Sequence, residues 1–332
     1  MNAKHDNLEP IEPRTARELF IDHKEAEVAA ATMKNYRYHL NPFLEWCENE
    51  RIDNLNELNG RDIQQYRLWQ KQTTDLTQMT VKNHMSTMRV FLKWCASIEA
   101  VPSELYDKIL IPRVPPEERQ RDEILDADDA EEILEYLNRY HYGSIEHVIL
   151  ALLWETGMRM GGARALDLDD VLLDQRMLRL VHRPNTDTPL KNGERGERLV
   201  AISSEFVAIL DDHIRDRRID VNDEFGRTPL LTTEHGRMSG SALRIVVYNV
   251  TAPCFRNELC RDCADQPAGK CGDSVSPHSI RRGSITNFLS NDVPVEVVSD
   301  RMNVGKKVLD MHYDKRSEEV KVEQRRGYLN QL

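Results

Sequence analysis

The chain has 332 residues, 40% of them hydrophobic, and its 56 acidic and 45 basic residues give a net charge of −11. This length exceeds what one hydrophobic core usually serves, so we expect two domains. The longest unbroken apolar run, Val148 to Trp154, has seven residues, whereas roughly twenty are needed to cross a bilayer, which argues against a membrane protein. The amino terminus lacks a basic start followed by an apolar stretch, so we expect no secretory signal and a cytoplasmic location.

The acidic composition, taken alone, argues against a nucleic-acid partner, because phosphates select basic surfaces. At about 1 M salt, however, the Debye length is only about 3 Å, so the overall acidity no longer repels DNA and local cationic contacts decide whether it binds. The acidic composition is then typical of a halophilic cytoplasm. Two basic islands stand out in the acidic chain. Residues 61–95 carry six basic and two acidic residues, and residues 275–317 carry seven and five.

Residues 19–94 are expected to form helices only, because their apolar residues recur every three or four positions. These core positions are Met33, Tyr36, Leu40, Phe43, Cys47, Val81, Met85, Met88, Leu92 and Cys95. The apolar positions from Val81 to Cys95 form one stripe of a helix, and four other residues of that helix lie outside the stripe: Lys82, His84, Arg89 and Lys93. This basic face either contacts phosphates or is merely solvated. We expect one helical domain over residues 14–110.

Residues 111–122 contain three prolines and several charges, which predicts a linker. Beyond it, Asp126 can cap a helix, and a helix from Ile145 to Glu155 should end at Gly157. Two strand-like runs follow, separated by a long polar stretch, and predict a hairpin. The runs are 177–182 and 197–202, and the expected later helices are 205–217, 239–250, 277–289, 294–302 and 306–312. Residues 123–332 should form an α+β domain, so the whole chain is mainly α with a small antiparallel sheet.

Four residues of this second domain can carry chemistry. Arg159 follows directly on the buried helix that ends at Gly157. His278 and Arg281 stand three residues apart at the start of a helix that a proline opens, so they share one face near the positive end of the helix dipole. That arrangement predicts an anion site. Tyr313 lies near the carboxyl end, beside basic residues.

The order of these residues resembles the catalytic domain of the tyrosine recombinase (phage integrase, Xer-like) family. The segment LLWETGMRMGGARALDLDDV resembles the first arginine box of the family, and TPLKNGERGERLVAI resembles its lysine-bearing hairpin, with Lys191 as the matching lysine. SPHSIRRGSITNFL resembles the second box, and VSDRMNVGKKVLDMHYDKR resembles the stretch that ends in the nucleophilic tyrosine. The helical amino half resembles the core-binding (SAM-like) domain, and haloarchaeal integrase-like members are the most similar.

The resemblance implies a site-specific DNA recombinase that works through a 3′-phosphotyrosine intermediate. Arg159 and Arg281 would clamp the phosphate oxygens, and His278 would accept or relay a proton. Lys191 would protonate the departing 5′ oxygen and Tyr313 would attack. No cofactor is implied for catalysis, and the implied partners are double-stranded DNA and further copies of the chain on paired sites. The expected DNA contacts are Lys82, Arg89, Lys93 and Arg282.

The sequence departs from the family at two positions. The His or Trp that the family usually places nine residues before the tyrosine is Val304, and the acidic residue three after the first arginine is Gly162. One phosphate donor is therefore missing, and the alternative function is a zinc-braced DNA-binding regulator that keeps the recombinase fold but cannot cleave. A relaxing enzyme like the type IB topoisomerases is a third.

Simpler roles exist for two of the candidate residues. The alternative role for Arg159 is an ordinary salt bridge with Asp167 or Asp169. The alternative for Lys191 is that it is only a solvated loop lysine, since its hairpin contains other basic residues that could take the same role. These residues are Arg183, Arg195 and Arg198.

Four cysteines lie in one polar insertion, residues 254–271. The four are Cys254, Cys260, Cys263 and Cys271. Their spacing favours tetrahedral ligation of a structural zinc ion, with disulfides as an alternative that a reducing cytoplasm disfavours. Cys47 and Cys95 lie on apolar stripes and are expected in the core. The tail after Tyr313 is expected to dock onto a neighbouring copy.

Overall fold

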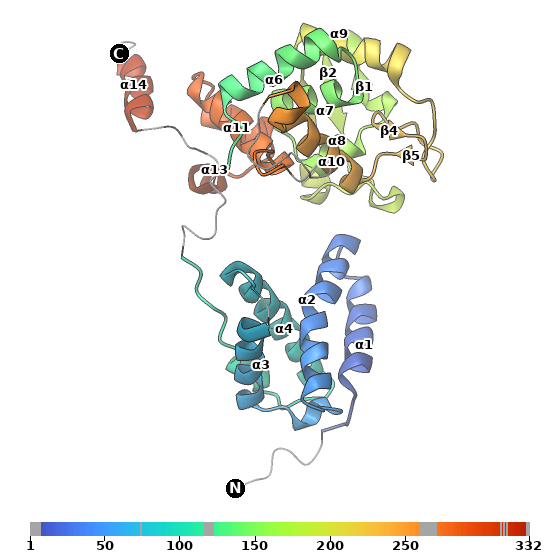
Figure 1. The fold of residues 1–332 in the computed structure, drawn as a ribbon, viewed down its shortest axis with the longest axis vertical. Helices are drawn as coiled ribbons and strands as arrows, with labels where there is room; N and C mark the ends of the chain where they lie inside the picture. Colours follow the sequence, from blue (N-terminus) through green and yellow to red (C-terminus); the bar gives the residue numbers. More distant parts are fainter. Residues whose placement is uncertain are drawn as a thin grey trace. The chain divides into compact units, whose positions relative to one another are not determined.

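The computed structural model describes residues 8–73, 75–115, 123–258, 271–312, 314, 316 and 318–329. The chain divides into two compact units, Met1–Arg121 and Asp122–Leu332 (Figure 1). Each unit has a hydrophobic core of its own. The structure is mainly helical with small antiparallel sheets, which confirms the predicted fold class. Within the ranges above, no helix is long and apolar enough to cross a membrane.

In the described part of the first unit, four helices pack around aromatic side chains. They are α1 (Pro13–Glu25), α2 (Ala30–Asn49), α3 (Gly60–Thr73) and α4 (Gln78–Ser97). The rings of Phe20 and Phe91 meet edge to face, as do those of Phe43 and Tyr66. The predicted apolar stripes face this core, and Cys47 and Cys95 are buried there as expected.

His84 corrects the predicted basic face of α4. The side chain is buried, and its Nδ1 lies 2.9 Å from Nε2 of Gln70, which in turn donates to the hydroxyl of Tyr66 at 2.6 Å. Burial, followed by the nearby His39, lowers the pKa of His84 to about 4. The imidazole is therefore neutral at pH 7 and is a core residue of the unit.

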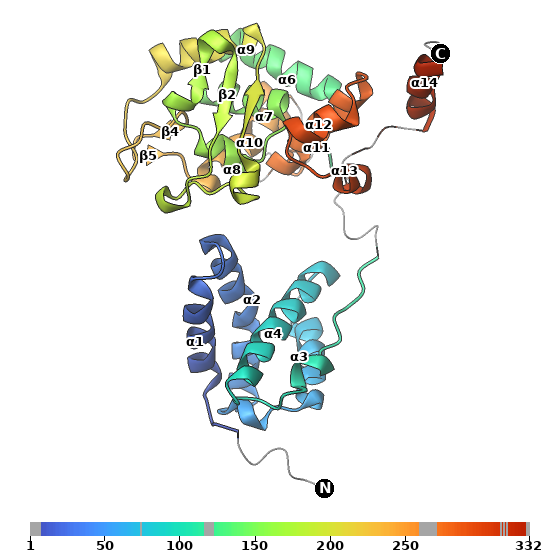
Figure 2. The same cartoon turned by 180° about the vertical axis from the view of Figure 1, so that it is seen from behind.

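The second unit combines helices with a three-stranded antiparallel sheet in the order β1-β2-β3. The chain first forms α6 (Ala127–Tyr140), α7 (Ile145–Thr156), α8 (Met160–Ala165), β1 (Val171–Leu172), β2 (Met177–Leu180) and β3 (Arg198–Ala201). It continues with α9 (Ser204–Asp212), the hairpin of β4 (Thr232–Thr233) and β5 (Gly236–Arg237), α10 (Gly240–Thr251), α11 (Pro277–Ser290), α12 (Val295–Arg301), α13 (Lys306–His312) and α14 (Glu318–Leu329). Figure 2 shows α11 and α12 packed side by side.

Local signals account for most of these elements. The carboxylate of Asp126 accepts a hydrogen bond from the Asp129 amide and caps α6. The predicted hairpin strands pair with each other, with Leu178 opposite Val200. The prediction missed α8 and β1, which have six and two residues and are too short to show a periodic pattern. It also took the five-residue π turn after α9 as plain helix.

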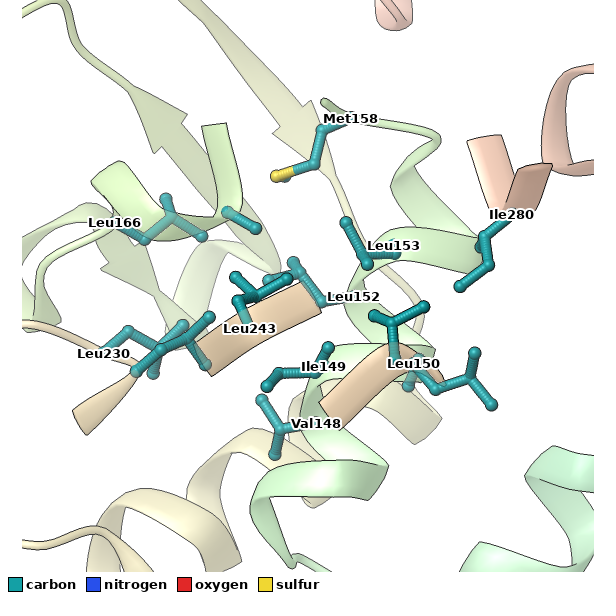
Figure 3. Packing of buried hydrophobic residues seen from close by; sticks show 14 of the residues in the cluster. Val148, Ile149, Leu150, Leu152, Leu153, Met158, Leu166, Leu230, Leu243 and Ile280 are labelled. Carbon is teal, nitrogen blue, oxygen red and sulfur yellow. The ribbon is translucent and has the colours of Figure 1, made fainter. Parts of the chain in front are cut away.

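The helix α7 is the centre of the second unit. It is apolar on all sides, and residues 148–153 are buried. Figure 3 shows these side chains packed against Leu243 of α10 and Ile280 of α11. The helix ends at Gly157, whose φ of 57° is a left-handed conformation that favours glycine. A Cβ there would also lie 2.6 Å from Sδ of Met302, so this turn is fixed from two sides before the chain reaches Arg159.

Candidate active site

Arg159 lies between two neighbouring pockets. The first has a volume of about 300 Å³, and its lining includes Arg159, His278, Arg281 and Arg244. The second is smaller, and its lining includes Arg159, Lys191, Arg198 and Asn303. The fold therefore brings together four of the five residues that the sequence singled out for chemistry, although up to 122 positions separate them in the chain.

The start of α11 positions His278 and Arg281. The hydroxyl of Ser276 accepts a hydrogen bond from the Ser279 amide and caps the helix. His278 is exposed and Arg281 is 1% exposed. One turn further on, a Cβ at Gly283 would lie 1.7 Å from the carbonyl oxygen of Leu125. Because only glycine fits this contact, the helix axis, and with it Arg281, is held in place.

Three consecutive carbonyl groups at the end of α12 each hold one arginine. Nε of Arg198 donates to the Arg301 carbonyl at 2.7 Å, and Nη2 of Arg281 donates to the Met302 carbonyl at 2.8 Å. Nη1 of Arg159 donates to the Asn303 carbonyl at 3.1 Å. The last carbonyls of a helix have no partner within it, so they are available to outside donors. We call Arg159, Arg198 and Arg281 the carbonyl-held arginines.

Asn303 connects this turn to the hairpin that carries Lys191. Its φ of 47° is left-handed, which asparagine tolerates better than most residues. Its side-chain oxygen accepts a hydrogen bond from Nδ2 of Asn192 at 2.7 Å, and its own Nδ2 donates to the Arg195 carbonyl at 2.8 Å. Lys191 is exposed beside these contacts.

The base of the same hairpin is fixed by ion pairs. Asp170 is fully buried and accepts two hydrogen bonds of 2.8 Å from Arg183. Burial acts to raise the pKa of Asp170, but the bonds and charge of Arg183, the Asp167 amide and Arg179 together outweigh it, so the pKa lies below its ordinary value. Asp167 bonds to Arg227 and Arg237, and Asp223 also bonds to Arg237. We call Arg183, Arg227 and Arg237 the paired arginines.

The carbonyl-held arginines create an excess of positive charge. In the part of the chain that the structure describes, no carboxylate forms an ion pair with Arg159 or Arg198. Asp167, the alternative partner for Arg159, bonds to paired arginines instead. Burial, and then the charges of Arg281 and Arg159, lower the pKa of Arg198 to about 10. The guanidinium of Arg198 therefore stays charged at pH 7, and the larger pocket, which Arg159 and Arg281 line, suits an anion with several oxygens.

The structure explains both departures from the family pattern. Val304 is 5% exposed and packs with Leu289, Val298 and Leu309, so it offers the pockets no donor. Gly162 is buried, and a Cβ there would lie 2.8 Å from Cδ2 of Leu180. A larger residue at that position would require the Leu180 side chain to move.

Several predicted residues fall outside the described ones. Tyr313 is among them, and the helix α13 ends at the residue before it. Cys260 and Cys263 are also outside, whereas Cys254 is exposed and Cys271 is 8% exposed. Among the residues with described positions, no three His, Cys, Asp or Glu side chains form a group that could hold a metal.

The expected DNA contacts differ in exposure. Lys93 is exposed and Lys82 is half-buried on α4. Arg89 is half-buried on the same helix, and its Nη2 donates to the carbonyl of Ile109. Arg282 is only 7% exposed, next to Arg281 on α11.

Comparison with known proteins assigns the fold to a family. Residues 19–97 match the SAM-like N-terminal domain of phage integrases, and residues 123–313 match the phage integrase family itself. The chain belongs to the phage integrase family. The family match covers the carbonyl-held arginines, His278 and Lys191, and it ends at Tyr313.

Named relatives are distant. Tyrosine recombinase XerC of Xanthomonas campestris is 24% identical over 204 residues, which are 61% of this chain and 59% of that protein. The chain therefore spans less than two thirds of that relative. XerC of Corynebacterium glutamicum is 21% identical over 88% of this chain and 84% of its own length. The Tn1549 transposon integrase, solved in complex with transposon right end DNA, shares the fold with a TM-score of 0.66 and 13% identity, over 95% of this chain and 99% of that one.

Sequence reasoning missed three residues of the pockets, Arg198, Arg244 and Asn303. Arg198 was visible only as one of several basic residues in the hairpin, with no pattern to separate it from Arg183. Arg244 lies on α10, far from every recognised motif in the sequence. Asn303 acts through a left-handed backbone and its main-chain carbonyl, which no side-chain motif reports.

Proposed function

We propose that this chain is a site-specific DNA recombinase, an integrase that cuts and rejoins DNA through a 3′-phosphotyrosine intermediate. One observation carries the proposal: Arg159, His278 and Arg281 line one pocket, and Lys191 lines the next, in a member of the phage integrase family. The pockets match the needs of phosphoryl transfer, because the chemistry requires cations around the phosphate and a proton source near the leaving group.

The expected reaction uses each residue once. Attack on a phosphodiester increases negative charge on the two non-bridging oxygens, and Arg159 and Arg281 stabilise it there. A tyrosine with a pKa of about 10 is a weak nucleophile at neutral pH, so His278 takes or relays its proton as the oxygen of Tyr313 bonds to phosphorus. The bond to the 5′ oxygen breaks, and Lys191 supplies the proton for this leaving group. Attack by a 5′ hydroxyl on the phosphotyrosine then rejoins a strand.

The proposed substrate is duplex DNA, as in the complex of the Tn1549 integrase. Lys82, Arg89 and Lys93 on α4 are proposed to contact phosphates. Several copies of the chain are proposed to assemble on paired sites, with the tail after Tyr313 docking onto a neighbour. Light scattering with and without DNA that carries two sites tests this assembly.

A structural zinc ion in the segment 254–271 also stays a proposal, and it is supported by the cysteine spacing alone. One zinc per chain after dialysis, and none in Cys260→Ser, would support it. A zinc-free protein of unchanged stability would contradict it.

The deciding experiment uses nicked suicide duplexes with the end sequences of the element that encodes the chain. The protein is mixed with them over a series of salt concentrations, because DNA affinity falls steeply with salt. We expect a covalent protein–DNA band with the wild type and with the control Tyr248→Phe. No band is expected with Tyr313→Phe. A band that persists in Tyr313→Phe contradicts the assignment of the nucleophile.

The burial of Val304 favours one competing function, a DNA-binding regulator, because the pockets lack the donor that relatives place there. Binding without a covalent band on every duplex would support that function. Relaxation of a supercoiled plasmid without any target site would instead support an enzyme like the type IB topoisomerases.

A further inference from the structure

We propose that Arg198 is a third arginine ligand of the scissile phosphate and replaces the donor that is missing at Val304. The inference rests on the proposed recombinase function and adds a residue to its site. It starts from the second pocket, where Arg198 lies with Arg159 and Lys191 in the lining.

Arg198 keeps part of its guanidinium available. It begins β3 and is half-buried. Nε donates to the Arg301 carbonyl and Nη1 donates to the Gly196 carbonyl at 2.8 Å. Nη2 has no hydrogen bond to any residue that the structure describes. Two donors therefore hold the side chain in place, and the third nitrogen remains for a ligand at the pocket.

The electrostatics of Arg198 point to an anion rather than to a purely structural role. A buried cation is costly unless an opposite charge accompanies it. Arg183, which follows β2 in the same hairpin, donates two hydrogen bonds to the buried carboxylate of Asp170. Arg198 has no such ion pair: burial and then the positive charges of Arg281 and Arg159 lower its pKa, and the charge of Asp300 offsets them only in part. A phosphate between the three arginines would supply the missing negative charge.

The position of Arg198 also fits the missing donor. Its acceptor, the carbonyl of Arg301, and the acceptor of Arg159, the carbonyl of Asn303, belong to the turn that directly precedes Val304. Arg198 is thus held by the turn from which the usual family donor would come. With the side chain of residue 304 in the core, Arg198 and Lys191 are the cations beside Arg159 among the described residues that line the pocket, and Lys191 is already proposed as the proton donor.

The test compares two substrates that differ in charge. One duplex carries the normal scissile phosphodiester, and the other carries a methylphosphonate there, in which a neutral methyl replaces a charged non-bridging oxygen. We expect Arg198→Gln to slow covalent adduct formation on the phosphodiester about 100- to 1000-fold relative to wild type. On the methylphosphonate, the ratio of the wild-type rate to the Arg198→Gln rate should be at least about tenfold smaller, because there is less charge for the guanidinium to stabilise. Arg198→Lys should be intermediate, since it keeps the charge and loses the planar fork.

The matched control is Arg195→Gln, which removes an exposed arginine three residues away. It should leave both rates close to those of wild type. If Arg198→Gln loses the same factor on both substrates, or none, Arg198 is not a phosphate ligand. If Arg198→Gln does not fold, Arg198→Lys against wild type on the two substrates gives the same comparison. If the wild type forms no adduct with either duplex, the recombinase function itself is wrong, which is a different result from the loss of Arg198 alone.

Discussion

The second unit contains two sets of arginines that the sequence does not distinguish but whose hydrogen-bond acceptors differ in charge. Arg183, Arg227 and Arg237 bond to aspartates, one of which is fully buried. Arg159, Arg198 and Arg281 donate to main-chain carbonyls, three of them consecutive. A carboxylate cancels the charge of an arginine, whereas a carbonyl fixes its position and leaves the charge in place. The paired arginines therefore belong to the scaffold, and Arg159 and Arg198 keep a charge that the proposed anion site can use.

The largest effect is expected from the scaffold set. Asp170→Asn removes the charge that accompanies Arg183, and breaking a buried pair from one side costs about 3–5 kcal/mol. Urea unfolding of the full chain should show this loss for the transition of the second unit. Asp169→Asn, an exposed neighbour, should be nearly silent. Equal stability of the two variants would remove the distinction between the sets.

The opposite pattern is expected from the site set. Arg159→Gln should change the free energy of unfolding by less than about 1 kcal/mol, because it breaks no ion pair. It should lower the rate of covalent adduct formation about 100- to 1000-fold, since a donor to the developing charge is lost. Suicide-duplex gels and urea curves measure the two quantities. The control is the exposed Arg195→Gln, which should change neither quantity. A stability loss in Arg159→Gln as large as that of Asp170→Asn would contradict the expectation.

As the pH falls, the contribution of a buried histidine to the free energy of unfolding should be lost before that of the paired arginines and their aspartates. Burial lowers the pKa of His147 to about 4, so the unfolded chain takes up a proton near pH 6.5 while the folded chain does not. Stability should therefore fall by up to about 3 kcal/mol as the pH drops from about 6.5 to 4. Asp170, whose pKa is lowered, stays charged in this range and loses its contribution only below about pH 3.8.

Urea midpoints at several pH values check this order. His147→Gln should have a flatter dependence on pH than the wild type between pH 6.5 and 4. A dependence as steep as that of the wild type would show that another group controls acid stability.

The smallest effect is expected in the first unit, which also contains arginines of both kinds. Arg89 donates to the Ile109 carbonyl, whereas Arg17 bonds to Glu18. Arg89→Gln should reduce the slope of log binding constant against log salt by about 0.9, the value for one phosphate contact. Arg17→Gln should leave the slope unchanged. Fluorescence anisotropy with a labelled duplex at four or more salt concentrations measures both, and equal slopes would limit the distinction to the second unit.

Much of the fold was predictable because its signals are local. The cap at Asp126 and the stop at Gly157 depend on residues within a turn of each other. Burial was harder to predict where a partner comes from another helix. His84 looked exposed because its partner Gln70 lies on α3, and Arg282 looked exposed because spacing does not show that α11 packs tightly at Gly283.

The site was predictable as far as motifs describe it. The resemblance named Arg159, His278, Arg281 and Lys191, and the fold places them around neighbouring pockets. The sequence could not separate Arg183 from Arg198, because both are basic residues of one hairpin. Their difference arises from Asp170 on one side and the carbonyl of Arg301 on the other, and only tertiary structure brings these acceptors close.

The acceptors at the end of α12 belong to the main chain, and this affects how the site tolerates mutation. A carbonyl group is present whatever side chain its residue carries, so exchanges at position 301 leave the anchor point of Arg198 intact. Position 303 keeps the anchor point of Arg159 with any residue that tolerates the left-handed backbone. An inserted or deleted residue in this turn would instead shift every anchor point at once. The turn should therefore tolerate substitutions far better than changes in length, and a family member with a longer or shorter turn would have to hold its arginines in another way.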